Sequence, residues 1–178
     1  MTHTIYQTDG IVLGKKDFGE ADRVLVIFTK EFGKINAVAQ GVRYIKSKLR
    51  YSLEPLSFSR VGLVAGKSGE WRIVDAEEIE NYREIITKPE NIILFSRIIS
   101  LIDKMLQGEE KNIFLWNKIK NISEILSRKK LSKKELRALE ISSLLEILNN
   151  LGYIDIQRCK TEKESVSAIN KAIKESML

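Results

Sequence analysis

The chain has 178 residues, with 30 lysines and arginines against 24 aspartates and glutamates, and its net charge of +6 suits a polyanionic partner. Its single cysteine, Cys159, excludes an intrachain disulfide and a zinc site built from four thiolates, and it favours a reducing compartment. No uncharged apolar run reaches the roughly 18 residues of a membrane span, and no secretory leader pattern opens the chain. We therefore expect a cytoplasmic protein that has no membrane anchor.

The first 80 residues are rich in β-branched and aromatic residues, in short runs separated by glycine, which is typical of an all-β unit. The second run, Val24–Phe28, is apolar without alternation, so we expect its strand to be buried on both faces. Five short antiparallel strands favour a small closed barrel without exposed edges, and the OB-fold is the natural candidate. The pattern places the strands at 5–15, 21–29, 34–40, 56–64 and 70–79.

Beyond Pro89 the apolar residues recur at three- and four-residue spacing, which predicts helices. We expect an α+β chain, with an OB-fold domain at 1–80 and an α-helical domain at 81–178. The predicted helices are one that ends before Gly108, one over 112–127, one that begins at the capping-box pair Ser132 and Glu135 and ends at Gly152, and one over 162–177.

Side chains suited to catalysis are scarce. The only histidine, His3, lies at the terminus without a neighbouring partner. Gly66-Lys67-Ser68 resembles the end of a phosphate loop, but Val61 replaces the leading glycine and a strand follows, so a β-turn is the better interpretation. We therefore predict no catalytic residue, no cofactor and no metal site. An acidic cluster that lacks convergent metal-ligand spacing is better interpreted as a solvated strand end: Asp75, Glu77, Glu78 and Glu80.

The segment 41–51 has four basic residues, no acidic residue and interleaved tyrosines. Cations attract phosphates and aromatic rings stack on bases, so this composition indicates a nucleic-acid interface. A solvated loop whose charges keep the protein soluble is the alternative interpretation. The residues expected to bind DNA are Arg43, Lys46, Lys48 and Arg50 as phosphate contacts, Tyr44 and Tyr51 as stacking rings, and Lys15, Lys16, Arg23 and Lys34 as an extension of the track.

A second basic run surrounds the start of the third predicted helix. Cations near a helix N-terminus oppose the helix dipole, at a cost of a few tenths of a kcal/mol, so local stability does not explain them. An acidic protein partner would explain them, and solubility is again the alternative. The candidate partner-binding residues are Arg128, Lys129, Lys130, Lys133, Lys134 and Arg137.

The N-terminal pattern resembles the bacterial RecO family of recombination mediators. Order and spacing agree over about 80 residues, and a looser similarity covers Leu148 to Cys159. The residues that support the resemblance are Gly10–Leu13, Phe18–Arg23, Phe28-Thr29, Phe32–Lys34, Gly41–Arg43, Lys46-Ser47 and Leu53–Pro55.

This resemblance implies an OB-fold domain that binds single- and double-stranded DNA, joined to a helical domain. It also implies strand annealing, contact with the acidic C-terminal tail of single-stranded-DNA-binding protein, cooperation with RecR and a place at the nucleoid. Many relatives have a four-cysteine zinc module, whereas Cys159 is followed here by no further cysteine or histidine. We therefore predict no zinc, and we expect a reduced helical domain because the chain is shorter than is usual for the family.

Three hypotheses follow. The first is a DNA-binding recombination mediator without enzymatic activity. The second is a protein-interaction adaptor, in which the basic helical domain captures an acidic peptide beside an apolar groove and the barrel serves as a scaffold. The third is an RNA-binding OB-fold protein such as a translation factor, which a preference for RNA over DNA would distinguish.

Overall fold

The computed structural model describes residues 4–66, 69–79, 85, 87–106 and 108–176. The chain divides into two compact units, one of residues 1–83 with 107–113 and the other of residues 84–106 with 114–178. Three features of the sequence lie outside the described residues, namely His3, the pair Lys67-Ser68 and Glu80.

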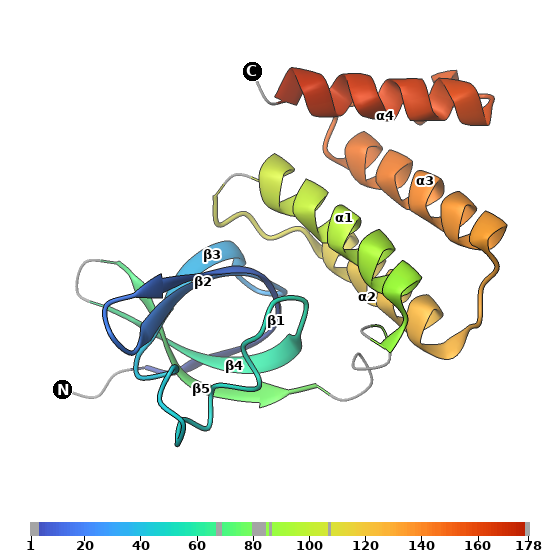
Figure 1. Ribbon diagram of the computed structural model, residues 1–178. Coiled ribbons are helices and arrows are strands. Elements are labelled where there is room, and N and C mark those ends of the chain that lie inside the picture. Colours follow the sequence, from blue (N-terminus) through green and yellow to red (C-terminus); the bar gives the residue numbers. More distant parts are fainter. Residues whose placement is uncertain (1–3, 67–68, 80–84, 86, 107, 177–178) are drawn as a thin grey trace. The chain divides into compact units, whose positions relative to one another are not determined.

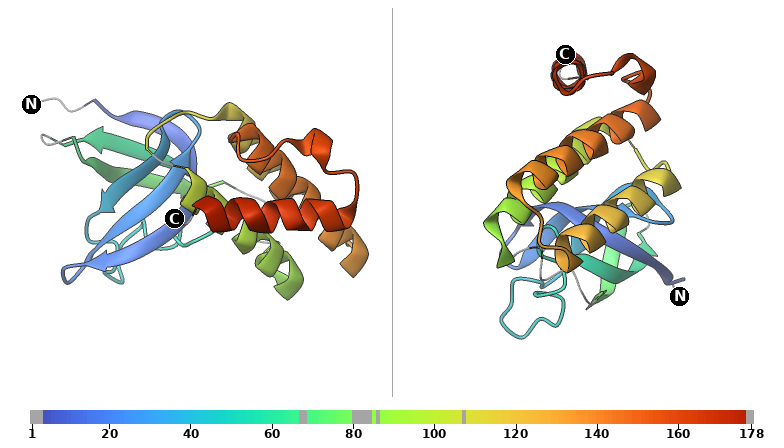
Figure 2. Two further views of the ribbon diagram at one scale, coloured as in Figure 1. Left: turned by 90° about the horizontal axis from the view of Figure 1, so that it is seen from above. Right: turned by 90° about the vertical axis from the view of Figure 1, so that its right-hand side faces the viewer.

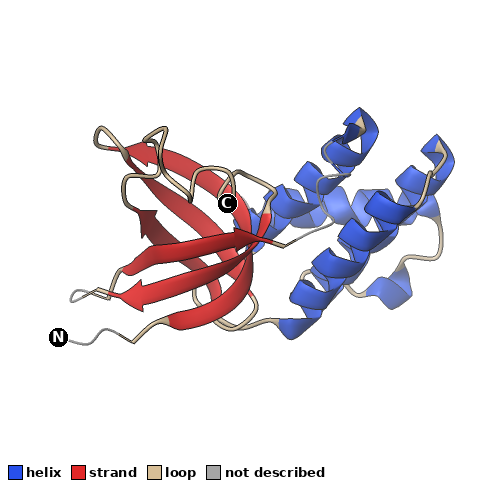
Figure 3. Cartoon of the chain, turned by 90° about the horizontal axis from the view of Figure 1, so that it is seen from below, coloured by secondary structure: helices blue, strands red, loops and turns tan. Residues whose placement is uncertain are grey.

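The first unit is a closed barrel of five strands in the order β1-β2-β3-β5-β4 (Figures 1 and 3). The predicted OB-fold barrel followed by helices is confirmed, and only the strand ends shift by a few residues. For example, β1 continues past Lys15 to Phe18. The strands are β1 (Tyr6–Phe18), β2 (Asp22–Thr29), β3 (Gly33–Ala39), β4 (Phe58–Ala65) and β5 (Trp71–Glu78).

One strand pair departs from the predicted antiparallel arrangement. β3 and β5 run parallel, with Val38 opposite Arg72, whereas the other four pairs are antiparallel. An odd number of strands cannot alternate in direction all the way around a closed ring, so one parallel pair is unavoidable. The prediction of five antiparallel strands was therefore wrong at this pair.

The barrel interior is filled by side chains from all five strands. Leu25 and Ile27 of β2 are fully buried there, but Val24 and Val26 on the other face are only half-buried. The expectation that this strand is buried on both faces was therefore wrong at these two valines. The buried residues of the interior are Val12, Leu25, Ile27, Ile35, Ala37, Ala39, Val42, Leu53, Val61, Leu63 and Ile73.

The long connection between β3 and β4, residues 40–57, contributes two of these buried residues. Val42 near its start and Leu53 near its end are 0% and 1% exposed. Between them the chain follows successive turns, in which Tyr44 N donates to Gly41 O at 3.1 Å and Ser47 N to Tyr44 O at 3.0 Å. The connection, cyan in Figure 2, is therefore anchored in the core at both ends and exposed in its middle.

Residues 108–113, which follow the first helix along the chain, belong to the barrel unit. Lys111 Nζ lies 2.7 Å from Glu31 Oε2, and Trp71 Nε1 donates to Glu109 Oε1 at 3.2 Å. Trp71 also packs against the rings of Tyr6 and Phe32, with centroids 5.7 and 5.1 Å away. This connecting segment therefore closes over the end of the barrel where β1 and β5 begin and the β2–β3 turn lies.

The second unit is helical. Its third helix begins with the predicted capping box, in which Glu135 N donates to Ser132 Oγ at 3.3 Å and Ser132 N donates to Glu135 Oε2 at 2.8 Å. No helix among the described residues is long and apolar enough to cross a membrane. The helices are α1 (Pro89–Met105), α2 (Ile113–Arg128), α3 (Lys133–Asn150), the short 3₁₀ helix η2 (Ile156–Arg158) and α4 (Glu162–Ser176).

Replacement of Gly33 by alanine tests the closure by the 108–113 segment. Gly33 has φ +67°, and a Cβ there would lie 2.3 Å from the backbone oxygen of Glu110. Both the strained backbone and the clash should destabilise the barrel by about 2 kcal/mol or more, measured as a lower urea midpoint by circular dichroism.

The matched control is Gly19→Ala, because Gly19 also has a positive φ, +57°, but a Cβ there meets no atom within 4 Å. Its free energy of unfolding should fall by only about 1 kcal/mol, because it has the backbone strain without the clash. Equal midpoints for the two variants would contradict the packing of residue 110 against Gly33.

Candidate nucleic-acid interface

The tip of the β1–β2 hairpin and the β3–β4 connection meet at one end of the barrel. The register pairs Asp17 with Arg23 and Arg23 with Ala39, so the hairpin tip lies where β3 ends. Gly41 N donates to Asp22 Oδ1 at 2.8 Å, and Arg43 N donates to Ala21 O at 2.9 Å. These bonds attach the start of the connection to the hairpin.

A cluster of ion pairs strengthens this attachment. Arg23 lies between two carboxylates, with its Nε 2.9 Å from Asp17 Oδ1 and its Nη1 3.1 Å from Glu54 Oε1. Lys15 also pairs with Glu54. Arg43 Nε lies 3.5 Å from Asp17 Oδ2, and its Nη1 donates to Gly19 O at 3.1 Å. Three cations predicted to contact DNA thus hold the hairpin and both ends of the connection together.

The two carboxyls of this cluster are held in their charged form. The hydrogen bond from Arg23 lowers the pKa of Asp17, against a smaller opposing effect of desolvation, and the charge of Arg43 lowers it further. Partial burial raises the pKa of Glu54, but hydrogen bonds and charge from Lys15 and Arg23 outweigh burial, so its net pKa is lowered. Both groups therefore favour the anchored connection most strongly when they are ionised.

The middle of the connection has a different character. Lys46 and Lys48 are exposed, as is Lys16 on the hairpin, and Arg50 is half-buried. Within the described part of the chain, none of these four residues forms an ion pair. Tyr44 and Tyr51 are exposed, at 63% and 73%. The anchored ends therefore present a segment of cations and rings to solvent.

Lys34 is separated from the other predicted DNA-binding residues. It lies near the start of β3 and is paired with Phe28, whereas the cation cluster lies where β3 ends. Five residues of a strand span roughly 17 Å, so Lys34 is close to the opposite end of the barrel. The structure brings together nine of the ten predicted residues and leaves Lys34 apart.

The second predicted site lies in the helical unit. Arg128 ends α2, and Lys133 and Lys134 begin α3. Arg137 Nε lies 2.6 Å from Glu162 Oε1, while Lys129 and Lys130 are exposed in the connection between the two helices. Beside Lys133 and Arg137 is a groove of about 320 Å³, whose apolar lining is Ile93, Leu94 and Leu136. Glu90 and the ion pair of Arg97 with Glu140 also line it.

Four further residues of the barrel end were not predicted from the sequence. Asp17 and Glu54 hold the cations, and Phe18 and Ile45 are apolar side chains that are 61% and 86% exposed. The ion pairs of Glu54 span 31 and 39 residues, and local pattern does not report such distances. Phe18 was detectable, because an aromatic residue directly before the turn glycine Gly19 has little opportunity to pack.

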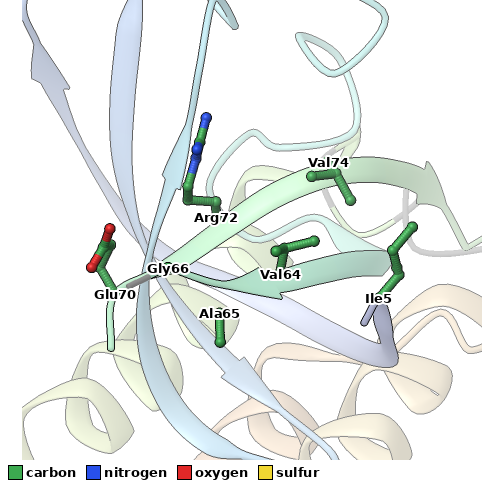
Figure 4. Close-up of a pocket in the computed structure, with 7 residues that line it drawn as sticks. All are labelled: Ile5, Val64, Ala65, Gly66, Glu70, Arg72 and Val74. Carbon is green, nitrogen blue, oxygen red and sulfur yellow. The ribbon is translucent and has the colours of Figure 1, made fainter. Parts of the chain in front are cut away.

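Another hollow lies on the outer surface of the barrel, with a volume of about 560 Å³. Ile5, Val64 and Val74 line it, and Glu70 and Arg72 add one charge of each sign (Figure 4). This balance does not favour a polyanion. Among the described residues, no group of three or more histidine, cysteine, aspartate or glutamate side chains is arranged to hold a metal ion.

The ion-pair cluster predicts the effect of Glu54→Gln. The variant leaves Lys15 and Arg23 without their shared carboxylate, so the connection should open more often. Trypsin cleavage after Lys46 and Lys48, followed by mass spectrometry, should be about fivefold faster at neutral pH, which corresponds to about 1 kcal/mol.

The dependence of this effect on pH follows from the lowered pKa of Glu54, whose ordinary value is 4.5. Its stabilisation is complete above that value and disappears as pH falls through the lower pKa of the folded state. The difference in thermal midpoint between variant and wild type should therefore shrink as the pH falls below 4.5 and vanish once Glu54 is protonated in the folded state. Glu20→Gln, at the exposed tip of the hairpin, is the control and should behave as the wild type does. A Glu54→Gln variant cleaved no faster would contradict the anchoring role.

The chain is similar to known proteins over the barrel and beyond it. The sequence pattern of the family described as "Recombination protein O N terminal" matches residues 1–82, which include all five strands. The protein named DNA repair protein RecO from Clostridium perfringens (strain 13 / Type A) is 30% identical over 168 residues, which cover 93% of this chain and 66% of the relative.

Two further relatives have the same name. The protein from Mycoplasma mycoides subsp. mycoides SC is 30% identical over 152 residues, which cover 84% of this chain and 60% of the relative. The protein from Bifidobacterium adolescentis is 43% identical over 79 residues, which cover 44% of this chain and 31% of the relative. The chain thus spans less than two thirds of the length of these relatives. With its barrel matched by the family pattern and most of its length matched by these relatives, the chain belongs to the RecO family.

Proposed function

We propose that this protein is a DNA-binding recombination mediator, which binds and anneals single-stranded DNA in DNA repair and homologous recombination. The observation that carries the proposal is the anchored β3–β4 connection, whose exposed middle offers Lys46, Lys48 and two tyrosines at the end of an OB-fold barrel. The relatives named DNA repair protein RecO support the same role.

Binding of this kind depends on charge neutralisation. Lysines and arginines that contact phosphates release condensed counterions, and this release favours association at low salt. Annealing requires two strands to be held with their charges screened, and it breaks no covalent bond. The proposed role therefore needs no catalytic side chain, and we assign none. Lys34 lies near the start of β3, away from the other proposed DNA-binding residues, so we expect it to contribute least to DNA binding.

The proposed partners are single- and double-stranded DNA, the acidic C-terminal tail of single-stranded-DNA-binding protein, and RecR. Around the apolar groove of the helical unit, three cations (Arg97, Lys133 and Arg137) outnumber two carboxylates (Glu90 and Glu140), and this excess favours an acidic peptide. Cations at the rim would attract the acidic residues, and the groove would accept apolar side chains. Arg137 would have to exchange its ion pair with Glu162 for the peptide.

The salt dependence of DNA binding tests the proposed role of the connection. For single-stranded DNA, the logarithm of the affinity should fall with the logarithm of salt concentration by about 0.7 per neutralised phosphate. The double variant Lys46→Glu with Lys48→Glu loses two cations, so fluorescence anisotropy should show weaker binding. The slope of log affinity against log salt concentration should be smaller in magnitude by about 1.4.

The matched control replaces Lys163 and Lys174 of α4 by glutamate. Both lysines are exposed, and the two substitutions change the net charge by the same amount. This control should keep the wild-type slope. An unchanged slope for the Lys46 and Lys48 variant would remove the connection from the interface. Tighter binding of an RNA strand of the same sequence would favour the RNA-binding alternative.

Titration of a labelled peptide with the acidic tail of single-stranded-DNA-binding protein tests the helical site. Lys133→Ala with Lys134→Ala should weaken binding roughly threefold to tenfold, because exposed cations each contribute a fraction of a kcal/mol to about 1 kcal/mol. Lys163→Ala with Lys174→Ala serves as the control and should bind as the wild type does. Equal affinity for all three proteins would exclude this groove as the peptide site.

A further inference from the structure

Three apolar side chains are exposed together at the same end of the barrel as the cations. Phe18 ends β1 at 61% exposure, and Tyr44 and Ile45 lie in the β3–β4 connection at 63% and 86%. Single exposed apolar residues are common on protein surfaces. These three differ because they come from two segments that are attached to each other by hydrogen bonds, so they share one small area.

A continuous series of contacts links Phe18 to Tyr44. Phe18 is opposite Asp22 in the register of β1 and β2, and cross-strand partners point to the same face of a sheet. Asp22 Oδ1 accepts the bond from Gly41 N at 2.8 Å. A Cβ at Gly41 would lie 3.2 Å from Cδ2 of the Tyr44 ring. Phe18 and Tyr44 therefore flank the same turn, and Ile45 follows directly.

The surroundings of this area are cationic. Lys16 lies two residues before Phe18 on the same face of β1, and Lys46 follows Ile45. Segments 15–23 and 41–54 together have seven lysines and arginines against four carboxylates. Three of these carboxylates have partners within the fold, since Asp17 and Glu54 form ion pairs and Asp22 binds Gly41 N. The excess charge at this surface is therefore positive.

An occupant of this surface needs flat apolar faces and a polyanionic backbone. Unpaired nucleotides have both, because their base faces are open to stacking and their phosphates reach the surrounding cations. In a duplex the base faces are covered by neighbouring base pairs, so the same apolar side chains gain little. A single strand therefore fits the surface better than a duplex does.

We propose that Phe18 and Ile45, together with Tyr44, form a platform that receives unpaired bases and makes the protein prefer single strands to duplex DNA. This inference rests on the proposed function, because the cations supply the attraction and the platform supplies the selectivity. Phe18 and Ile45 are the members to test, since the sequence pattern does not mark either of them as a DNA contact.

The test compares three probes of equal length: an oligothymidylate of about 20 nucleotides, longer than the roughly 4–16 that an OB-fold covers, the same strand with abasic sugars, and a duplex. Phe18→Ala should weaken thymidylate binding about tenfold, and Ile45→Ala about threefold, because loss of one stacking contact has effects of this order. Neither variant should change the affinity for the abasic strand or the duplex. The salt slope should stay as in the wild type.

Ile5→Ala is the matched control for Ile45→Ala, because Ile5 is also exposed, at 57%, but lines the hollow on the outer barrel surface. It should bind every probe as the wild type does. Phe18→Trp keeps an aromatic face at the hairpin tip and should retain tight thymidylate binding, which separates the loss of a ring from a folding defect.

Two results would overturn the inference. One is an equal loss of affinity of Phe18→Ala for thymidylate and abasic strands, which would make Phe18 a structural residue. The other is unchanged thymidylate binding by both alanine variants, which would leave the apolar area to a protein partner. Wild-type protein that binds no strand at all would instead overturn the proposed function itself, and with it the platform.

Discussion

The shared contact of Glu54 with Lys15 and Arg23 is the interaction on which the rest of the barrel end depends. A connection of this length loses much conformational entropy when it is ordered, and polar turns alone recover little of that loss. Here Val42 and Leu53 bury both ends in the barrel interior, and the carboxylate of Glu54 fixes the second end to β1 and β2. The exposed middle is thereby presented from a rigid base.

This arrangement divides the cations of the barrel end between two tasks. Lys15, Arg23 and Arg43 are engaged with Asp17 and Glu54, so their charge is partly neutralised and their position is fixed. Lys46 and Lys48 are exposed, and no carboxylate among the described residues neutralises their charge. A count of basic residues along a sequence treats both groups alike, although only the second is directly available to a polyanion.

The elements of the fold were largely accessible from the sequence because they follow local rules. β-branched runs between glycines gave the strands, and Ser132 with Glu135 gave the start of α3. A parallel pair follows from a closed ring of five strands, but which two strands form it was not accessible, because the pairing of β3 with β5 depends on the strand order around the whole ring. The separation of Lys34 from the other predicted DNA-binding residues was not accessible either, because it depends on the direction in which β3 runs. Similarly, the role of Glu54 depends on partners more than thirty residues away.

The segment 108–113 has a consequence for the modularity of the chain. It follows α1 in sequence, yet its contacts are with the barrel, where Lys111 meets Glu31 and Glu109 meets Trp71. No single cut of the polypeptide can therefore release the barrel with its complete surface. A fragment that stopped before α1 would lose the contacts of Glu109 with Trp71 and of Lys111 with Glu31, whereas a fragment that continues through residue 113 keeps them. The barrel unit is thus discontinuous in sequence, because it contains residues from before and after the segment 84–106, which belongs to the helical unit.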